Sequence, residues 1–96
     1  MYGTMFHMRP RPGHEQAILD GWDAWDRDRR PKVEGAIANY LFRLASGELA
    51  GVAVFSSRET YLKNASDPDQ DRWYRQLRDN LEADPVWEDG EILRGG

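Results

Sequence analysis

Apolar and polar residues alternate like a strand in some parts of the chain and recur at helical spacing in others. The residues from Tyr2 to Arg9 alternate, and the "RPRPG" motif that follows predicts a turn because each proline removes a ladder donor. From His14 to Arg29 the spacing predicts an amphipathic helix that stops at Pro31. Its apolar side carries Ile18, Trp22 and Trp25.

The middle of the chain predicts a hairpin followed by a short helix. Two strand-like runs, Ala36 to Leu44 and Leu49 to Phe55, are joined by "ASGE", in which serine and glycine suit a tight turn. Ser56, with Glu59 three residues later, predicts a capping box that starts a helix running through Leu62.

The last third of the chain predicts a longer helix and one more strand. Asp67 suits the N-cap and Pro68 the first helical position, so this helix is expected to run through Ala83 and to stop before "DP". The tail "VWEDGEIL" predicts a final strand. Its acidic residues and glycine are typical of an edge strand.

The element order, β-α-β-β-α-β, predicts an α+β, ferredoxin-like βαββαβ fold as one domain over residues 1–96. Both sides of the central strands are apolar, although the two helices can cover only one face of a sheet. We therefore expect a partner subunit, most simply in a homodimer. The first of these strands carries Ala36, Ala38, Tyr40 and Phe42 on one side and Ile37 and Leu41 on the other, and the second carries Leu49, Ala53 and Phe55 against Ala50, Val52 and Val54.

Composition and charge exclude several classes of function. The 96 residues have a net charge of −4, which argues against binding nucleic acid or an anionic membrane. The chain has no cysteine, and His7, His14 and the carboxylates lack a metal-ligand spacing, so no metal site is expected. The first residues contain no long apolar run, which predicts neither a signal peptide nor a membrane span and favours a cytoplasmic location.

These features together resemble the antibiotic biosynthesis monooxygenase-like domains of the dimeric α+β barrel superfamily. The resemblance rests on the element order, on "RPG" closing the first strand, on the aromatic residue and short capped helix in "FSSRETYLKNASDP", and on the return strand. It implies two sheets packed face to face in a dimer, with a cavity in each subunit between sheet and helices. Members of the family include cofactor-independent oxygenases of polycyclic aromatic substrates, haem-degrading enzymes and domains with no assigned reaction.

The haem-degrading branch of this family does not fit the residues present. The resemblance implies an asparagine on the first strand, a tryptophan on the helix after the third strand, and a histidine about ten residues beyond it. These places fall at or beside Phe6, near Asn64, and near Trp73 or Tyr74. A lone strand histidine such as His7 is more often structural than an iron ligand, so we expect no haem and no other cofactor.

The oxygenase branch implies a substrate that is itself deprotonated and held in a dry aromatic pocket. His7 is a candidate for proton transfer because the ordinary pKa of histidine lies near neutrality. Candidate hydrogen-bond donors are Asn39, Arg43, Tyr61 and Gln70, and candidate wall residues are Trp22, Trp25, Trp73 and Tyr74. The predicted ligand-binding residues are His7, Trp22, Asn39, Tyr61, Gln70, Trp73 and Tyr74, and no catalytic residue is assigned.

Two alternatives stay open from the sequence. Asn39 and Arg43 share a strand side, so they are equally suited to a dimer seam, with Arg43 paired to an acid. Trp73 and Tyr74 lie on the core side of their helix, where they either fill the core or form the wall of a pocket. The function is accordingly either that of a cofactor-independent monooxygenase or that of a non-catalytic homodimeric ligand-binding or structural module.

Overall fold

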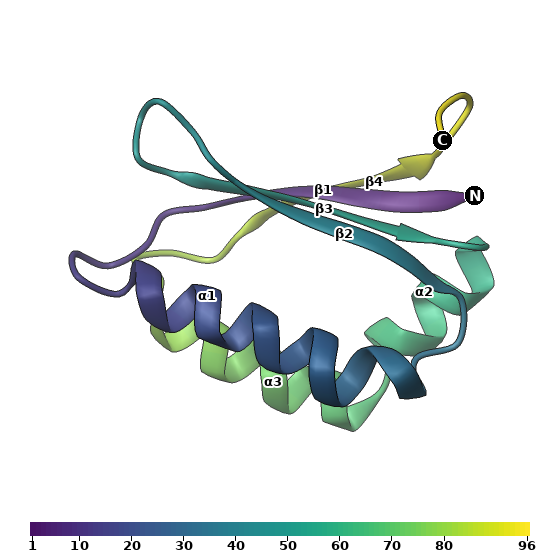
Figure 1. Cartoon of the computed structure of the whole chain (residues 1–96), viewed down its shortest axis with the longest axis horizontal. Coiled ribbons are helices and arrows are strands. Elements are labelled where there is room, and N and C mark those ends of the chain that lie inside the picture. Colours follow the sequence, from purple (N-terminus) through teal and green to yellow (C-terminus); the bar gives the residue numbers. More distant parts are fainter.

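The computed structural model describes residues 1–96 as a four-stranded antiparallel sheet with helices on one face (Figure 1). The strands lie in the order β2-β3-β1-β4. The predicted α+β, ferredoxin-like βαββαβ fold is therefore confirmed. Its elements are β1 (Tyr2–Met8), α1 (Glu15–Ala24), β2 (Ala36–Arg43), β3 (Leu49–Phe55), α2 (Arg58–Ala65), α3 (Pro68–Asp79) and β4 (Val86–Glu91).

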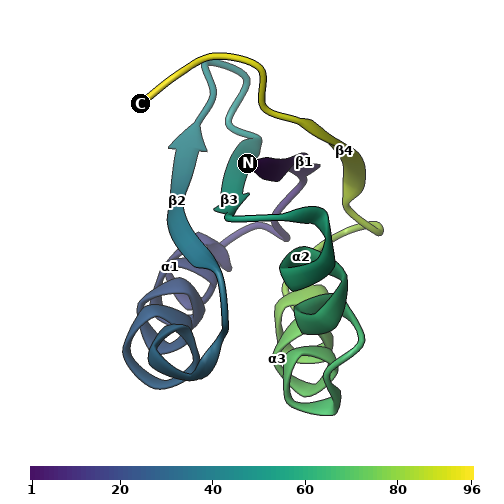
Figure 2. The same ribbon diagram turned by 90° about the vertical axis from the view of Figure 1, so that its right-hand side faces the viewer.

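All the helices lie on the same side of the sheet, and its other side is bare. In Figure 2, α1 lies below β2 on one side, and α2 and α3 lie together on the other. We call the helix side the covered face and the opposite side the open face. No helix has the length and apolar character needed to span a bilayer.

The helix starts follow the predicted capping chemistry, with one shift. At α3, the Asp67 side chain accepts a hydrogen bond from the Asp69 N–H at 2.8 Å, and Pro68 takes the first helical position. At α2 the capping box is one residue later than expected and joins Ser57 to Thr60. The reason is that the Ser56 N–H still bonds the Gly35 carbonyl beside the sheet, so Ser56 cannot begin the helix.

The two longer helices end differently from the sequence prediction. The segment after α1 widens into a π-helical turn at Trp25–Arg29 and then a 3₁₀ turn at Arg30–Lys32. Helix α3 stops at Asp79 and not at Ala83. The chain beyond it turns back to the end of β1, where Leu81 pairs with Pro10 and is fully buried.

The core lies between the covered face and the helices. Strand β3 has a glycine, Gly51, at the point where the Phe6 ring crosses it, and a methyl group there would overlap that ring. The ring therefore packs directly against the backbone of β3 at Gly51. The buried cluster consists of Phe6, Met8, Ile18, Leu49, Leu77 and Leu81.

A β-bulge between Ala36 and Ala38 decides which residues of β2 face each side. The bulge inserts one extra residue, Ile37, and so shifts the phase of alternation along the strand. As a result Ala36 lies opposite Phe55 on the covered face, while Tyr40 and Phe42 lie on the open face. The predicted side was wrong for Ala36 and Ile37 for this reason, whereas Ala38, opposite Val54, shares the open face with Tyr40 and Phe42 as predicted.

The open face is apolar, as the sequence predicted for a second sheet side. Val52 of β3 lies opposite Met5 of β1 on one side and Tyr40 of β2 on the other, so these three side chains form a continuous row across the open face. Four large apolar side chains of this face are each more than half exposed, namely Met5, Tyr40, Phe42 and Val86.

Candidate ligand-binding cavity

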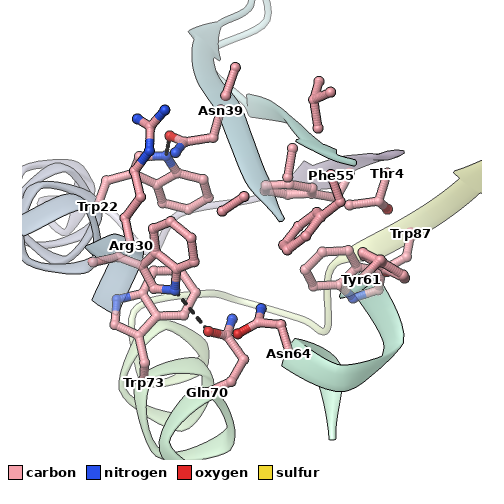
Figure 3. Close-up of a pocket in the computed structure, with 16 residues that line it drawn as sticks. Thr4, Trp22, Arg30, Asn39, Phe55, Tyr61, Asn64, Gln70, Trp73 and Trp87 are labelled. Carbon is pink, nitrogen blue, oxygen red and sulfur yellow. Dashed lines mark hydrogen bonds between the residues drawn. The ribbon is translucent and has the colours of Figure 1, made fainter. Parts of the chain in front are cut away.

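A cavity of about 80 Å³ lies between the covered face and the helices (Figure 3). It opens between the segment that follows α1 on one side and α2 with α3 on the other. Eleven of its 16 lining residues are hydrophobic, so its wall is apolar with a few polar groups. Its aromatic residues are Phe6, Trp22, Trp25, Phe55, Tyr61, Trp73 and Trp87.

Four tryptophans line the cavity, and the indole N–H groups of three of them are hydrogen-bonded within the protein. An indole nitrogen is only a donor, and each of these nitrogens already has an acceptor. These three rings therefore offer a ligand their apolar faces and no hydrogen bond. Trp22 Nε1 donates to Asn39 Oδ1 at 2.9 Å, Trp25 Nε1 to Gln70 Oε1 at 2.8 Å, and Trp73 Nε1 to the Gly21 carbonyl oxygen at 2.9 Å.

Two carboxamide groups, those of Asn64 and Gln70, lie side by side at one end of the cavity (Figure 3). The oxygen of Gln70 accepts from Trp25, and the oxygen of Asn64 accepts from Arg29 Nη2 at 2.9 Å. Indole and guanidinium groups are donors only, so neither amide can flip without losing its bond. The NH₂ groups of both amides thus remain as donors for a ligand at this end of the cavity.

Arg29 joins three elements at this end of the cavity. It lies in the π-helical turn, and its side chain is only 14% exposed. Besides Asn64, the guanidinium approaches Asp67 at 3.7 Å and Asp69 at 3.9 Å, both at the N-terminus of α3. These contacts fix the orientation of the Asn64 amide. A π-helical turn inside a helix often occurs at a functional site.

Asn39 has both halves of its amide bonded inside the chain. Its oxygen accepts from Trp22, and its nitrogen donates to Asp26 Oδ1 at 2.9 Å. Arg43 pairs with Glu15 of α1 at 2.6 Å, which confirms the predicted acidic partner. Both side chains bond residues of the helix side within the chain, and the alternative that places them at a dimer seam stays a prediction.

A second cluster of polar side chains, formed by Thr4, Tyr61 and Asp89, lies at the strand side of the cavity. The Tyr61 hydroxyl donates to Asp89 Oδ1 at 3.0 Å, and the buried Thr4 hydroxyl donates to the same oxygen at 2.7 Å. Burial, together with the hydrogen bond to Asp89, raises the pKa of Tyr61 to about 12. Tyr61 is therefore a neutral phenol across the physiological pH range.

The structure brings most of the predicted site residues together. His7 was a wrong prediction, because alternation from Phe6 and Met8 turns it onto the open face, exposed to solvent. Tyr74 does not line the cavity but packs against the core, with its ring centroid 6.3 Å from that of Trp87. The predicted residues that do line the cavity are Trp22, Asn39, Tyr61, Gln70 and Trp73.

Sequence reasoning did not assign several lining residues to the ligand site. Thr4 shares the buried parity of Phe6, so its place was readable from the alternation of β1. Trp87 shares its side of the short edge strand β4 with the acidic Asp89, so the pattern of that strand does not show its inward side. The lining residues not predicted as part of the site are Thr4, Phe6, Arg30, Ala36, Ala38, Ala53, Val54, Phe55, Asn64 and Trp87.

Comparisons with known proteins find similarity in three dimensions only. No family model and no curated protein matches the sequence. Among solved structures, Rv0793 from Mycobacterium tuberculosis superposes with a TM-score of 0.81 at 20% identity, covering 98% of this chain and 96% of that one. A protein described as an antibiotic biosynthesis monooxygenase gives 0.77 at 11% identity, with 98% and 100% covered.

A further match is SnoaB, a cofactor-independent oxygenase from Streptomyces nogalater. It superposes with a TM-score of 0.75 at 10% identity and covers 98% of this chain and 94% of that one. These identities are too low to transfer an activity, but the superpositions extend over nearly the whole chain. The predicted resemblance is confirmed for the fold, which this chain shares with these structures over nearly its whole length.

Proposed function

We propose that residues 1–96 form one domain that acts as a cofactor-independent monooxygenase-like protein and binds a small, mostly aromatic ligand between sheet and helices. The observation that supports this proposal is the pairing of an aromatic wall with two fixed amide NH₂ groups, those of Asn64 and Gln70. The rings would stack on a flat ligand, and the amides would bind an acceptor oxygen at its edge. The ligand class is therefore an aromatic carbonyl, phenol or phenolate.

The same arrangement suits oxygenation of an activated ligand. Two N–H donors directed at one ligand oxygen would stabilise the negative charge that forms when the ligand loses a proton. Such an electron-rich anion can react with dioxygen. For a ring CH₂ group the balanced outcome is a carbonyl group and one water molecule, which takes the second oxygen atom and both hydrogens.

The alternative function is a non-catalytic homodimeric ligand-binding module. The small cavity favours it, because about 80 Å³ is below the roughly 300 Å³ at the lower end of ordinary ligand pockets. The position of His7 also favours it, since the histidine proposed for proton transfer lies on the other face of the sheet. A polycyclic substrate would require the cavity to widen.

We also propose that a second copy of the chain covers the open face. Met5, Tyr40, Phe42 and Val86 form an apolar surface that no element of the chain covers. A stable dimer buries more than about 1,000 Å² in total. The apolar open face of a four-stranded sheet is suited to an interface of that kind, and the family resemblance implies the same arrangement.

The experiment for this function follows the indole N–H signals of ¹⁵N-labelled protein by NMR during titration with phenol, 2-naphthol and anthrone. Saturable shifts of Trp22, Trp25 and Trp73 with any of the three would support a ligand site. Oxygen uptake with protein-dependent conversion of anthrone to anthraquinone would support the monooxygenase. Saturable binding without turnover would support the binding module, and the absence of any saturable shift would contradict both.

A further inference from the structure

The cavity has two polar ends of different character. At the helix end, Asn64 and Gln70 offer amide hydrogens. At the strand end, the polar atoms belong to Thr4 and Tyr61, and both residues line the cavity. Whether these hydroxyl groups donate to a ligand or accept from it depends on which atoms take their two protons.

Both hydroxyl protons are directed away from the ligand by one carboxylate. Asp89 Oδ1 lies 3.0 Å from the Tyr61 hydroxyl and 2.7 Å from the Thr4 hydroxyl, and a carboxylate can only accept. Thr4 has a second acceptor, the Glu88 carbonyl oxygen at 3.3 Å. Neither hydroxyl therefore needs a ligand to satisfy its donor.

The oxygen of Tyr61 can still accept a hydrogen bond while its proton is donated to Asp89. With its proton on Asp89, and with the Thr4 proton on Asp89 or Glu88, the Tyr61 oxygen keeps a lone pair for a ligand donor; the nearby Thr4 hydroxyl, which lowers the pKa of Tyr61, is the protein donor that competes for it. The raised pKa of Tyr61 agrees with a phenol that stays protonated and bonded to the carboxylate. The strand end is thus an acceptor, in contrast to the donor end formed by the two amides.

We infer that Tyr61 is a specificity-determining residue that accepts a hydrogen bond from a ligand hydroxyl, and that Asp89 is the positioning residue that keeps the Tyr61 oxygen an acceptor. This inference rests on the proposed function, because it deepens the ligand class of the same cavity. The ligand is a flat apolar molecule with an acceptor oxygen at one end and an O–H group at the other. Asp89 belongs to the edge strand β4 and is not part of the cavity wall.

The test uses a pair of probes that differ only in the ability to donate. 2-Naphthol and 2-methoxynaphthalene have the same ring system, and each has one oxygen that can lie at the Tyr61 end of the cavity, but only 2-naphthol has an O–H to donate there. Calorimetric titration of the parent protein should show about tenfold tighter binding of 2-naphthol, as expected for one hydrogen bond made in a buried site. The one-ring pair, phenol and anisole, repeats the comparison at smaller size.

The variants separate the role of each residue. Tyr61→Phe keeps the ring and removes the acceptor, so the tenfold preference should fall to about one while 2-methoxynaphthalene still binds. Asp89→Ala frees the Tyr61 proton to turn into the cavity, where it can donate to the ether oxygen, so the preference should also fall. Glu88→Gln is the matched control, since Glu88 lies next in the strand but on the open face opposite Met5, and the preference should stay at its parent value.

The failures of this inference and of the proposed function are distinguishable. If both probes bind and the preference is the same in the parent and Tyr61→Phe proteins, the inference is overturned and the ligand site stands. If neither pair binds to the parent protein, the proposed function is overturned and the inference with it. A Tyr61→Phe protein that does not fold leaves Asp89→Ala as the deciding variant, and an unchanged preference there overturns the role of Asp89.

Discussion

The covered and open faces of the sheet use alternate residues of the same strands for opposite purposes. On the covered face, the amide of Asn39 is hydrogen-bonded to Trp22 and Asp26 beside the cavity. On the open face, Tyr40 and Phe42 from the same strand expose apolar surface with no partner in the chain. The comparison predicts that the proposed ligand binding and the proposed self-association can be altered separately, because adjacent residues of one strand lie on different faces.

The largest expected effect comes from a charge on the open face. Val52 lies at its centre, so Val52→Asp should bury an unpaired carboxylate in the dimer and raise the dissociation constant at least 100-fold, or about 3 kcal/mol. Sedimentation velocity over a range of concentrations measures this change. Ser46→Asp, in the exposed hairpin turn, is the control and should stay dimeric. A folded Val52→Asp dimer of parent affinity would contradict the proposed interface.

The next effect tests the packing of the covered face. A methyl group on Gly51 meets the Phe6 ring, whereas one on Gly90 of the open face meets no atom within 4 Å. Gly51→Ala should therefore lower the free energy of unfolding by about 1–3 kcal/mol, as overpacking does, and Gly90→Ala should change it by less than about 0.5 kcal/mol. Chemical denaturation at one protein concentration compares them. Equal losses would mean that the two faces are packed alike.

The polarity of the donor end can be reversed without changing its shape. Gln70→Glu keeps an oxygen for the Trp25 N–H but replaces the free NH₂ by a second acceptor. Binding of 2-naphthaldehyde, whose only polar atom is an acceptor oxygen, should weaken about 10- to 100-fold, or roughly 1.4–2.8 kcal/mol. Gln76→Glu adds the same charge on an exposed part of the same helix and should bind like the parent. Unchanged binding by Gln70→Glu would remove Gln70 from the site.

A smaller effect is expected where one residue serves both core and wall. Trp73→Phe loses the hydrogen bond to the Gly21 carbonyl, so it should cost about 1–2 kcal/mol of stability and also weaken ligand binding. Trp73→Ala should cost about 3–5 kcal/mol. Trp87→Phe is the comparison, because Trp87 shares the wall but is 43% exposed, and it should lose less stability. A large stability loss for Trp73→Phe, with unchanged ligand binding, would make Trp73 a core residue only.

The smallest effect concerns the pH dependence of stability. The pKa of Tyr61 is raised from 10.0 to about 12 by burial and by Asp89, so its contribution is complete below about pH 10 and is lost as pH rises toward 12. Tyr61→Phe should lack this loss, and Asp89→Asn should move it to lower pH. Ultraviolet titration of tyrosine ionisation, paired with thermal unfolding, checks both. Identical alkaline profiles for parent and Tyr61→Phe would contradict the assignment.

The fold was largely predictable because its signals are local. Proline, serine and aspartate at the turns and caps act through their own backbone, and the element order then leaves few arrangements. The deviations came from contacts far along the chain. Ser56 pairs with Gly35 and not with the helix, and Leu81 leaves α3 because it pairs with Pro10.

The site was less predictable, since side-chain direction depends on the phase of each strand. His7 has suitable chemistry, but the inward positions of Phe6 and Met8 turn it out of the cavity. Of the two donor amides, Gln70 was predicted and Asn64 was not. Which atom of Gln70 faces the cavity is set by Trp25, 45 positions away in the chain, and no local pattern encodes that bond.

The bulge in β2 has a consequence for the space available to a ligand. In a regular strand that keeps Asn39 opposite Ala53, alternation would place Ile37 opposite Phe55. The extra residue instead places Ala36 there and turns Ile37 outward. A strand of the same residues without the bulge would carry a branched side chain where the cavity now has a methyl group. The volume of this cavity is thus encoded by the number of residues in a strand as well as by their identity.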